Sequence, residues 1–318
     1  MIRASAAQPW LDLRGEPVAS HLWNFAIGGI SLQILCHHDN PAMMSPGLQP
    51  FQTAVACSDV QVTVKKVPDL IRSSSHRLFD SGATWTLFQS CDGFAFDFSD
   101  ASLRGCPLKR LLIDEQFTSG TLQISERVFR PYAESLSPLA YPLDELLIMH
   151  RLTQERAIEL HGTGIVRANG VANLFVGHSG AGKSTTTRLW TSREEVEVLS
   201  DDRIIVRYDD GRDGPAGATQ MRMYGTPWHG EAMFASPNSA PLTRIFVLEH
   251  GQGNVITRLS RSEAVGELFA RAFVPFHRHE YIENALSFLE QLVSSVPCYR
   301  YLFEPDERAV EKIQQFND

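Results

Sequence analysis

The chain has 318 residues, of which 43% are hydrophobic and 21% charged, and its formal net charge is −8 at pH 7. This composition is typical of a globular protein with a core, and the acidic balance gives no reason to expect nucleic acid or an anionic membrane as a partner. No apolar run approaches the roughly 18 residues of a membrane span, and the first ten residues lack the apolar segment of a signal peptide. The five cysteines are scattered, which favours reduced thiols and a cytoplasmic location.

The N-terminal part, residues 1–140, has the period-two apolar spacing and glycine turns of an antiparallel sheet. The expected strands cover 25–27, 30–34, 60–64, 85–87, 94–98, 111–113 and 122–124, with turns at 28–29, 91–93 and 118–120. We find no combination of acid, base and nucleophile in these strands. This β-rich domain is therefore expected to recognise an acceptor rather than to perform chemistry.

A proline-rich stretch up to Pro142 predicts a domain boundary near residue 140, and the pattern of residues 141–318 is typical of an α/β domain. Ser260 and Glu263 have the spacing of a capping box that begins a helix. The expected helices cover 143–153, a segment from Lys183, 260–273, 280–294 and a segment after Pro305; the expected strands cover 157–162, 171–176, 196–199, 204–208, 245–248 and 298–303.

The most specific motif follows the apolar segment at 174–176. It is the run Gly177-His178-Ser179-Gly180-Ala181-Gly182-Lys183-Ser184, with Thr185 next, and it matches the phosphate-binding P-loop. Its glycines allow successive backbone N–H groups to surround a phosphate, and the following helix directs its positive end at the same anion. Lys183 is expected to reach the outer phosphates, and the hydroxyl of Ser184 is expected to bind Mg²⁺. Residues 177–185 are therefore expected to bind ATP.

Two adjacent carboxylates, Asp201 and Asp202, come 18 and 19 residues after Lys183, where the expected strand 196–199 ends. Ligand sites in α/β sheets lie at the carboxyl ends of strands, and a P-loop site needs a nearby acid for Mg²⁺. One carboxylate could hold the metal while the other removes a proton from an attacking hydroxyl.

The order His161-Gly162, P-loop and Asp201-Asp202, at these spacings, resembles the HPr serine kinase/phosphorylase group, which is related to ATP-dependent phosphoenolpyruvate carboxykinase. The resemblance covers roughly residues 145–210. It implies that His161 lies by the γ-phosphate, that Asp201 holds Mg²⁺ and that Asp202 is the base. The chain departs from HPr kinases at Met221–Gly225 and resembles instead the stand-alone HPr-kinase-like enzymes of peptide modification, including lasso-peptide tailoring kinases.

The segment Gly225–Glu231 has two glycines and a proline, which define a shaped loop. Trp228 could form a flat apolar wall of an acceptor pocket, with His229 and Glu231 at its polar ends; the alternative is a surface loop with an anchored tryptophan. Phosphoryl transfer also needs positively charged side chains that contact the phosphoryl group as it is transferred. The candidates for this role are Arg203, Arg222 and Arg244.

Together these features predict an α/β P-loop kinase domain of the HPr kinase/phosphoenolpyruvate carboxykinase type at 141–318, preceded by a β-rich domain at 1–140. The expected activity is Mg²⁺-ATP-dependent transfer to a serine or threonine hydroxyl of a peptide, a protein or a small serine-like molecule. His161, Lys183 and Asp202 are the expected catalytic residues, and Ser184 and Asp201 the expected Mg²⁺ ligands. The alternative is an ATP-binding switch or slow ATPase with a regulatory N-terminal domain. Assembly into a homo-oligomer stays open.

Overall fold

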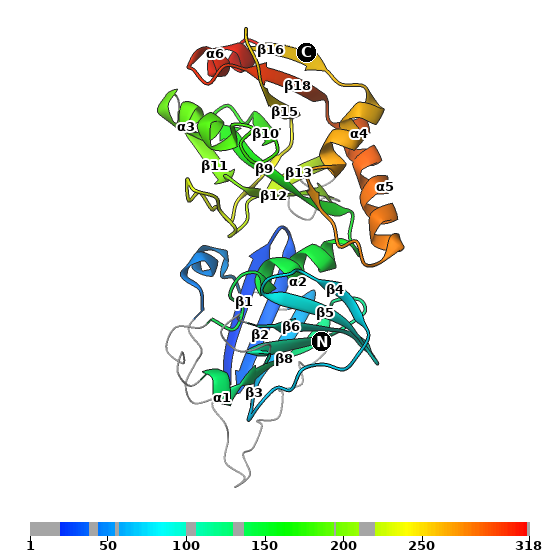
Figure 1. Ribbon diagram of the computed structural model, residues 1–318. Coiled ribbons are helices and arrows are strands. Elements are labelled where there is room, and N and C mark those ends of the chain that lie inside the picture. The colour runs from blue at the N-terminus through cyan, green and yellow to red at the C-terminus, as the bar shows by residue number, and fades with distance from the viewer. Residues whose placement is uncertain are drawn as a thin grey trace, which may run out of the picture. The chain divides into compact units, whose positions relative to one another are not determined.

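The computed structural model describes residues 20–37, 44–54, 57–99, 106–129, 137–193, 195–209 and 220–316. They form a mixed α/β architecture with two large sheets and few helices (Figure 1). The chain divides into two compact units. The second unit begins at Tyr141 and also includes two short segments from earlier in the chain, 26–30 and 46–53.

The sheet of the first unit has the order β1-β2-β3-β8-β7-β6-β5-β4. Its strands are β1 (Ser20–Ile27), β2 (Ile30–His37), β3 (Val60–Val67), β4 (Arg77–Asp80), β5 (Trp85–Ser90), β6 (Gly93–Phe98), β7 (Lys109–Asp114) and β8 (Ser119–Ser125). All of the strands expected from alternation are present. The expectation of a purely antiparallel sheet is wrong, because β3 pairs in parallel with both β2 and β8. The long connection from β2 to β3, which contains the 3-10 helix η1 (Pro46–Phe51), makes the parallel pairing possible.

The turn expected at 118–120 lies earlier in the chain, because β8 already begins at Ser119. The carboxylate of Asp114 accepts hydrogen bonds from the backbone N–H groups of Thr118 (2.8 Å) and Ser119 (2.8 Å). Phe117 takes a positive φ of 55° inside this turn. The side chain of Asp114, rather than the glycine, therefore determines where the chain reverses.

The sheet of the second unit has the order β14-β13-β12-β9-β10-β15-β18-β16, with β11 and β17 also paired to β9. Its strands are β9 (Ala157–Arg167), β10 (Ala172–Val176), β11 (Val196–Ser200), β12 (Arg203–Asp209), β13 (Gln220–Tyr224), β14 (Ser239–Pro241), β15 (Arg244–His250), β16 (Val255–Arg258), β17 (Ala272–Phe273) and β18 (Cys298–Phe303). The neighbours β10, β15 and β18 run parallel, so their carboxyl ends meet at one edge.

The helices are α1 (Glu126–Phe129), α2 (Leu143–Leu152), α3 (Lys183–Arg193), α4 (Arg261–Phe269), α5 (His279–Ser295) and α6 (Arg308–Gln314). The capping box of Ser260 and Glu263 is present. The helix that it begins is shorter than expected and ends at Phe269, because residues 272–273 pair with β9 instead. The last helix begins at Arg308, three residues after Pro305.

Both faces of the second sheet are covered by helices, which explains its nearly continuous apolar strands. Leu174 and Val176 of β10 belong to the core on the α4 and α5 side. Phe175, which lies between them, packs with Trp190 of α3 and with residues of α6. Figure 1 shows α4 and α5 on one side of the sheet and α3 and α6 on the other. Alternation along a central strand thus fixes which helices lie on which face.

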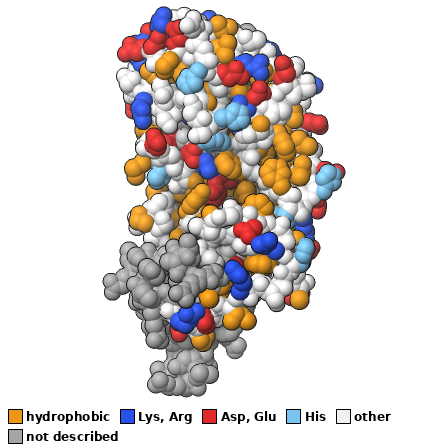
Figure 2. All heavy atoms as spheres, in the orientation of Figure 1, with side chains coloured by type: hydrophobic (Ala, Val, Ile, Leu, Met, Phe, Trp, Pro, Cys, Tyr) orange, Lys and Arg blue, Asp and Glu red, His pale blue; other side chains and the backbone are white. Residues whose placement is uncertain are grey.

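Among the described residues, no helix is long and apolar enough to cross a membrane. The cysteines are all free thiols. On the face shown in Figure 2, acidic and basic side chains are mixed rather than gathered by sign.

Candidate functional site

The glycine-rich loop, residues 177–184, connects the end of β10 to the beginning of α3. Gly182 takes a φ of +100°, and a Cβ atom there would lie 2.3 Å from the ring of Phe303. Gly180 also has a positive φ, of +80°. The imidazole of His250, at the end of β15, contacts the carbonyl oxygen of Gly180 at 2.8 Å and stacks on Phe303. Only glycine fits at position 182, so the neighbouring strands dictate the form of the loop.

Lys183 is the first residue of α3, and its side chain is only 7% exposed. Its Nζ donates hydrogen bonds to the carbonyl oxygens of Gly177 (3.0 Å) and His178 (3.1 Å). Burial lowers the pKa of Lys183 to about 8, although the charge of Asp202 acts in the opposite direction. The ammonium group is therefore held inside the loop and has a nearby carboxylate.

This loop borders a cavity of about 580 Å³, which we call the loop cavity. Its lining residues come from the loop, α3, the middle of β9, the ends of β11 and β15, and the 230–231 segment: His161, Ser179, Gly180, Gly182, Lys183, Ser184, Thr185, Arg188, Asp201, Asp202, Gly230, Glu231 and His250. The volume lies within the range of small-molecule sites. The structure thus brings most of the sequence-predicted site residues to one cavity; Gly177, His178 and Ala181 belong to the loop without lining it.

Asp201 follows β11 and is almost fully buried, with 2% of its surface exposed. Its two carboxylate oxygens accept hydrogen bonds from the backbone N–H groups of Gly230 (2.9 Å), Ala232 (2.8 Å) and Phe234 (3.2 Å). Asp201 therefore holds the 230–234 segment in place at the wall of the loop cavity. Most of its hydrogen-bonding capacity is used by this segment.

The neighbouring carboxylate, Asp202, has different partners. Its Oδ1 lies 2.9 Å from Nε2 of His161, and its Oδ2 forms an ion pair with Arg203. Burial raises the pKa of Asp202, but the hydrogen bond to His161 and the charge of Arg203 outweigh it, so the pKa lies below its usual value. Asp202 is therefore ionised at neutral pH.

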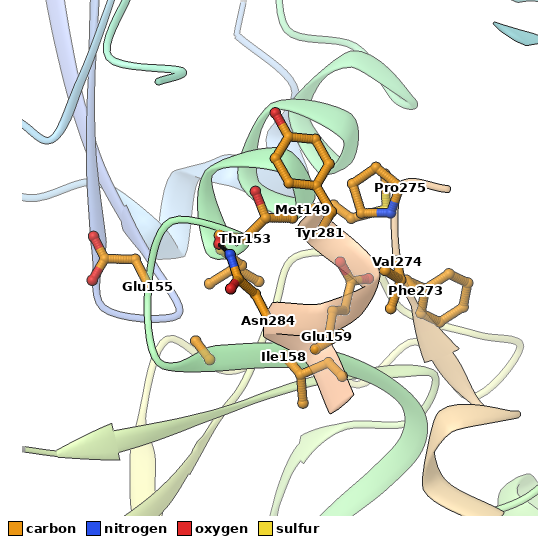
Figure 3. Close-up of a pocket in the computed structure, with 13 residues that line it drawn as sticks. Met149, Thr153, Glu155, Ile158, Glu159, Phe273, Val274, Pro275, Tyr281 and Asn284 are labelled. Carbon is orange, nitrogen blue, oxygen red and sulfur yellow. Dashed lines mark hydrogen bonds between the residues drawn. The ribbon is translucent and has the colours of Figure 1, made fainter. Parts of the chain in front are cut away.

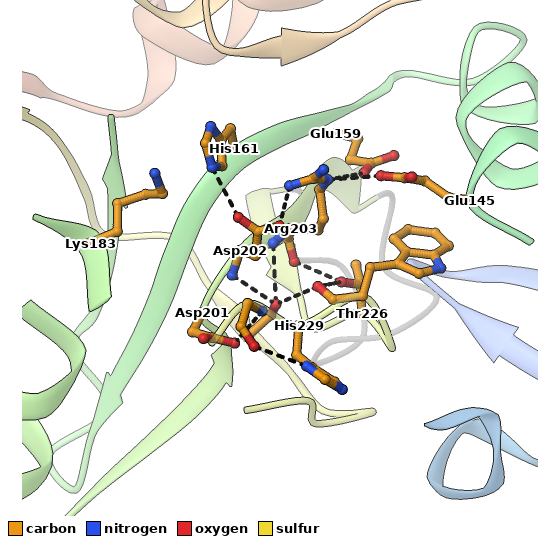
Figure 4. A network of polar contacts seen from close by, with 12 residues as sticks. Glu145, Glu159, His161, Lys183, Asp201, Asp202, Arg203, Thr226 and His229 are labelled. Carbon is orange, nitrogen blue, oxygen red and sulfur yellow. Dashed lines mark hydrogen bonds and ion pairs between the residues drawn. The ribbon is translucent and has the colours of Figure 1, made fainter. Parts of the chain in front are cut away.

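Behind Asp202, a network of charged side chains extends to α2 (Figure 4). Nε of Arg203 lies 2.8 Å from Oε1 of Glu145 and 3.6 Å from Oε1 of Glu159. The guanidinium also lies 4.1 Å from the ring centroid of Phe273. Glu159 is fully buried, and burial, followed by the charge of Glu145, raises its pKa well above the usual value. Arg203 therefore lies between the carboxylates of Glu145 and Asp202, and next to a glutamate whose raised pKa favours its neutral form.

The structure places the residues of the predicted acceptor loop, Gly225–Glu231, in different surroundings. Trp228 is 6% exposed, and its Nε1 donates a hydrogen bond to Asp144 of α2 (3.0 Å). His229 is exposed and contacts the carbonyl oxygen of Gly230. Neither residue is among those that line the loop cavity, whereas Glu231 is. The tryptophan thus anchors this segment to α2.

The predicted sources of positive charge do not reach the loop cavity. Arg222 is paired with Asp209, and Arg244 lies over the ring of Phe316. The arginine that lines the cavity is Arg188 of α3. It comes four residues after Ser184 and therefore lies on the same face of the helix, a signal that the sequence contained. His250 was likewise missed, although it ends a strand at the edge where ligands bind in other α/β sheets.

A second, much smaller cavity lies beside Glu159 (Figure 3). Its volume is about 20 Å³, and Tyr281 and Phe273 are among its lining residues. This space is close to that of one water molecule and cannot hold a nucleotide.

A scan against protein-family models gives no match for this chain, and a search of curated proteins finds no relative.

The environment of Trp228 predicts a structural role that Trp228→Phe can test. The variant loses the hydrogen bond to Asp144, which is buried, and we expect a loss of about 1–3 kcal/mol in the free energy of unfolding. Chemical denaturation measures this loss, and the affinity for Mg²⁺-ATP should stay at the parental value. A variant with parental stability but weaker binding or transfer would show instead that the indole contacts a ligand.

The raised pKa of Glu159 predicts how stability depends on pH. Above the ordinary carboxyl pKa of 4.5, the unfolded chain releases a proton that folded Glu159 still holds. The free energy of unfolding therefore falls as pH rises toward the folded pKa, by up to about 1.4 kcal/mol per pH unit. Glu159→Gln should remove this fall, and Glu290→Gln, at an exposed position on α5, should keep it. Urea unfolding at several pH values measures both slopes, and equal slopes would contradict the raised pKa of Glu159.

Proposed function

We propose that this protein is a Mg²⁺-ATP-dependent kinase that transfers the γ-phosphate to a serine or threonine hydroxyl of a peptide, a protein or a small serine-like molecule. One observation carries the proposal: the glycine-rich loop with Lys183 and the ionised carboxylate of Asp202 line the same cavity of about 580 Å³. Phosphoryl transfer asks the protein mainly for positioning and for charge, and both are present around this space.

The spacing of His161, the P-loop and Asp201-Asp202 supports the same activity through its resemblance to the HPr kinase group. In that resemblance the histidine lies by the γ-phosphate. His161 lines the loop cavity and contacts Asp202, so its position is compatible with this role. The edge where the parallel strands β10, β15 and β18 end is also where ligands bind in α/β sheets.

The residues around the loop fit Mg²⁺ by their chemistry. Hydroxyl and carboxylate oxygens are the ligands that Mg²⁺ prefers, and Ser184 and Asp201 supply them at one cavity. Within the described part of the chain, no three His, Cys, Asp or Glu residues form a metal cluster. In nucleotide sites Mg²⁺ commonly binds through one or two protein ligands together with the phosphates, and it keeps several waters. When bound, Mg²⁺ would offset negative charge on the outer phosphates.

The protein's own side chains would then divide the work. Lys183 and Arg188 would face the phosphates with positive charge, and the backbone N–H groups of the loop would bind their oxygens. Asp202, held in place by His161 and Arg203, would accept a hydrogen bond from the acceptor hydroxyl and then its proton. Glu231, exposed at the wall of the cavity, is the remaining candidate for contact with the acceptor.

A nucleotide-binding switch or slow ATPase is the second candidate, and one observation favours it. The carboxylate of Asp202 is already paired on both oxygens and has a lowered pKa, which makes it a weak base. A switch needs the loop and the metal but no base for an acceptor.

Asp202→Asn separates the two functions, because it keeps the shape of the side chain and removes its ability to take a proton. For a kinase we expect transfer to fall by about 10²–10⁴ while the affinity for Mg²⁺-ATP changes only a few-fold. The assay follows transfer from γ-labelled ATP to a library of serine- and threonine-containing peptides and, separately, phosphate release to water. Parental transfer by Asp202→Asn would exclude this base and leave the switch.

Asp201→Asn is the matched comparison at the adjacent carboxylate. Because its amide nitrogen would face the backbone N–H of one of its partners, Gly230 or Ala232, we expect a lower unfolding midpoint and a weaker response to Mg²⁺. If both substitutions had the same effects, the two carboxylates would not have separate roles.

A further inference from the structure

A third cavity of the second unit, which we call the rear pocket, has a volume of about 470 Å³. It lies where β16 leads into α4 and where α5 leads into β18 (Figure 1). Arg258, Leu259, Ser260 and Arg261 form one side, and residues 293–298 with Ala264 form the rest. The volume is within the range of small-molecule sites and close to that of the loop cavity.

The two arginines of this pocket differ from most arginines of this unit because their side chains have no partner among the described residues. In its described residues, nearly all arginines have an ion pair, a hydrogen bond or an aromatic partner, as Arg203, Arg222 and Arg300 do. Those without any such contact are Arg188, Arg258 and Arg261. Arg188 lines the loop cavity, and the other two line the rear pocket. Unpaired guanidinium groups of the described residues therefore occur at both the loop cavity and the rear pocket.

The charges around the two cavities differ in a way that selects their ligands. In the loop cavity, Lys183 and Arg188 are outnumbered by the carboxylates Asp201, Asp202 and Glu231, so an anion needs a metal ion with it. No acidic side chain is among the described residues that line the rear pocket. Its two arginines can bind an anion directly, and guanidinium groups suit both carboxylate and phosphate.

The remaining lining combines apolar side chains with three serines, Ser260, Ser294 and Ser295. Leu259, Ala264, Val296 and Cys298 are buried residues at its walls. Burial raises the pKa of the Cys298 thiol to about 12, although the charge of Arg258 opposes this. The thiol therefore stays protonated, and it adds apolar surface instead of a nucleophile or a second anion.

From these observations we propose that the rear pocket binds, without a metal ion, a small organic anion that carries a carboxylate or phosphate on a compact apolar group. Arg258 and Arg261 hold the anionic group, and the walls formed by Leu259, Ala264 and Cys298 contact the apolar part. β18 runs from Cys298, in the rear pocket, to Phe303, which packs on the glycine-rich loop. Its six residues span roughly 17 Å, so the two sites are separate. The proposal is therefore independent of the kinase activity.

The test uses the full chain, a metal chelator and three probes of similar size: phenyl phosphate, benzoate and the uncharged benzyl alcohol. Isothermal titration calorimetry measures their affinities for the parent and for three variants. The double variant Arg258→Gln with Arg261→Gln removes both charges of the rear pocket. The double variant Arg258→Lys with Arg261→Lys keeps them. Arg188→Gln removes the unpaired arginine of the loop cavity. None of these changes removes a hydrogen bond, ion pair or ring contact of the described residues, and the unfolding midpoint of each variant verifies folding.

We expect at least one of the two anions to bind the parent more tightly than benzyl alcohol, and the preferred anion identifies the ligand as a carboxylate or a phosphate. The double glutamine variant should weaken that binding by about tenfold or more, because two charge-assisted contacts are lost. The double lysine variant should keep part of the affinity, and Arg188→Gln should keep all of it. The proposal is overturned if neither anion binds the folded parent, or if the double glutamine variant binds as the parent does. Loss of binding in Arg188→Gln alone would place the anion in the loop cavity and equally overturn it.

Discussion

Arg203 carries a positive charge that is largely withdrawn from water, and its guanidinium contacts carboxylates from three segments of the second unit. A buried charge is stable only with partners, so the positions of Glu145 on α2 and Asp202 after β11 are coupled through it. Glu159 and His161 are two residues apart on β9 and therefore point to the same face. The first contacts Arg203 and the second contacts Asp202. Burial and the charge of Glu145 raise the pKa of Glu159, which reduces the negative charge in this group of acids.

This arrangement explains why the two adjacent aspartates differ. Asp201 is occupied by three backbone N–H groups and fixes the wall of the cavity, whereas Asp202 is oriented by side chains at its edge. Trp228 adds a second connection from the same wall to α2 through Asp144. The beginning of α2 thus supports both Asp202, through Glu145 and Arg203, and the segment at the cavity wall, through Asp144 and Trp228. Charge and hydrogen bonds, rather than the loop alone, determine the geometry of the site.

The local parts of the fold could be predicted from the sequence. Patterns of apolar residues identified most strands of both sheets but missed the strands β4, β13, β14, β16 and β17. The side chains of Ser260 and Glu263 identified the beginning of α4. Pairing between distant segments could not be predicted in this way. The parallel partners of β3 and the pairing of residues 272–273 with β9 depend on contacts far apart in the chain, which periodicity does not encode.

For the candidate site, the glycine-rich motif and the strand-final acids are local signals, and the structure brings them to one cavity. Glu145 and Arg203 are 58 residues apart, and no local sequence pattern predicts their contact. From the sequence, Trp228 could be an acceptor wall or the anchor of a surface loop, and the hydrogen bond of its buried indole to α2 favours the anchor. Arg188 and His250 could have been found by applying the helix spacing and the strand-end rule to every polar residue.

The most direct test of the central claim is the affinity of the full chain for ATP in the presence of Mg²⁺, measured for the parent, for Lys183→Ala and for Lys312→Ala. Lys312 is an exposed lysine on α6 and serves as the matched control. Loss of the buried ammonium at position 183 should cost about 2 kcal/mol or more of phosphate binding, which is roughly thirtyfold or more in affinity. Lys312→Ala should bind ATP as the parent does. Equal affinity of the parent and Lys183→Ala, with both folded, would contradict the assignment of residues 177–185 as the phosphate-binding loop.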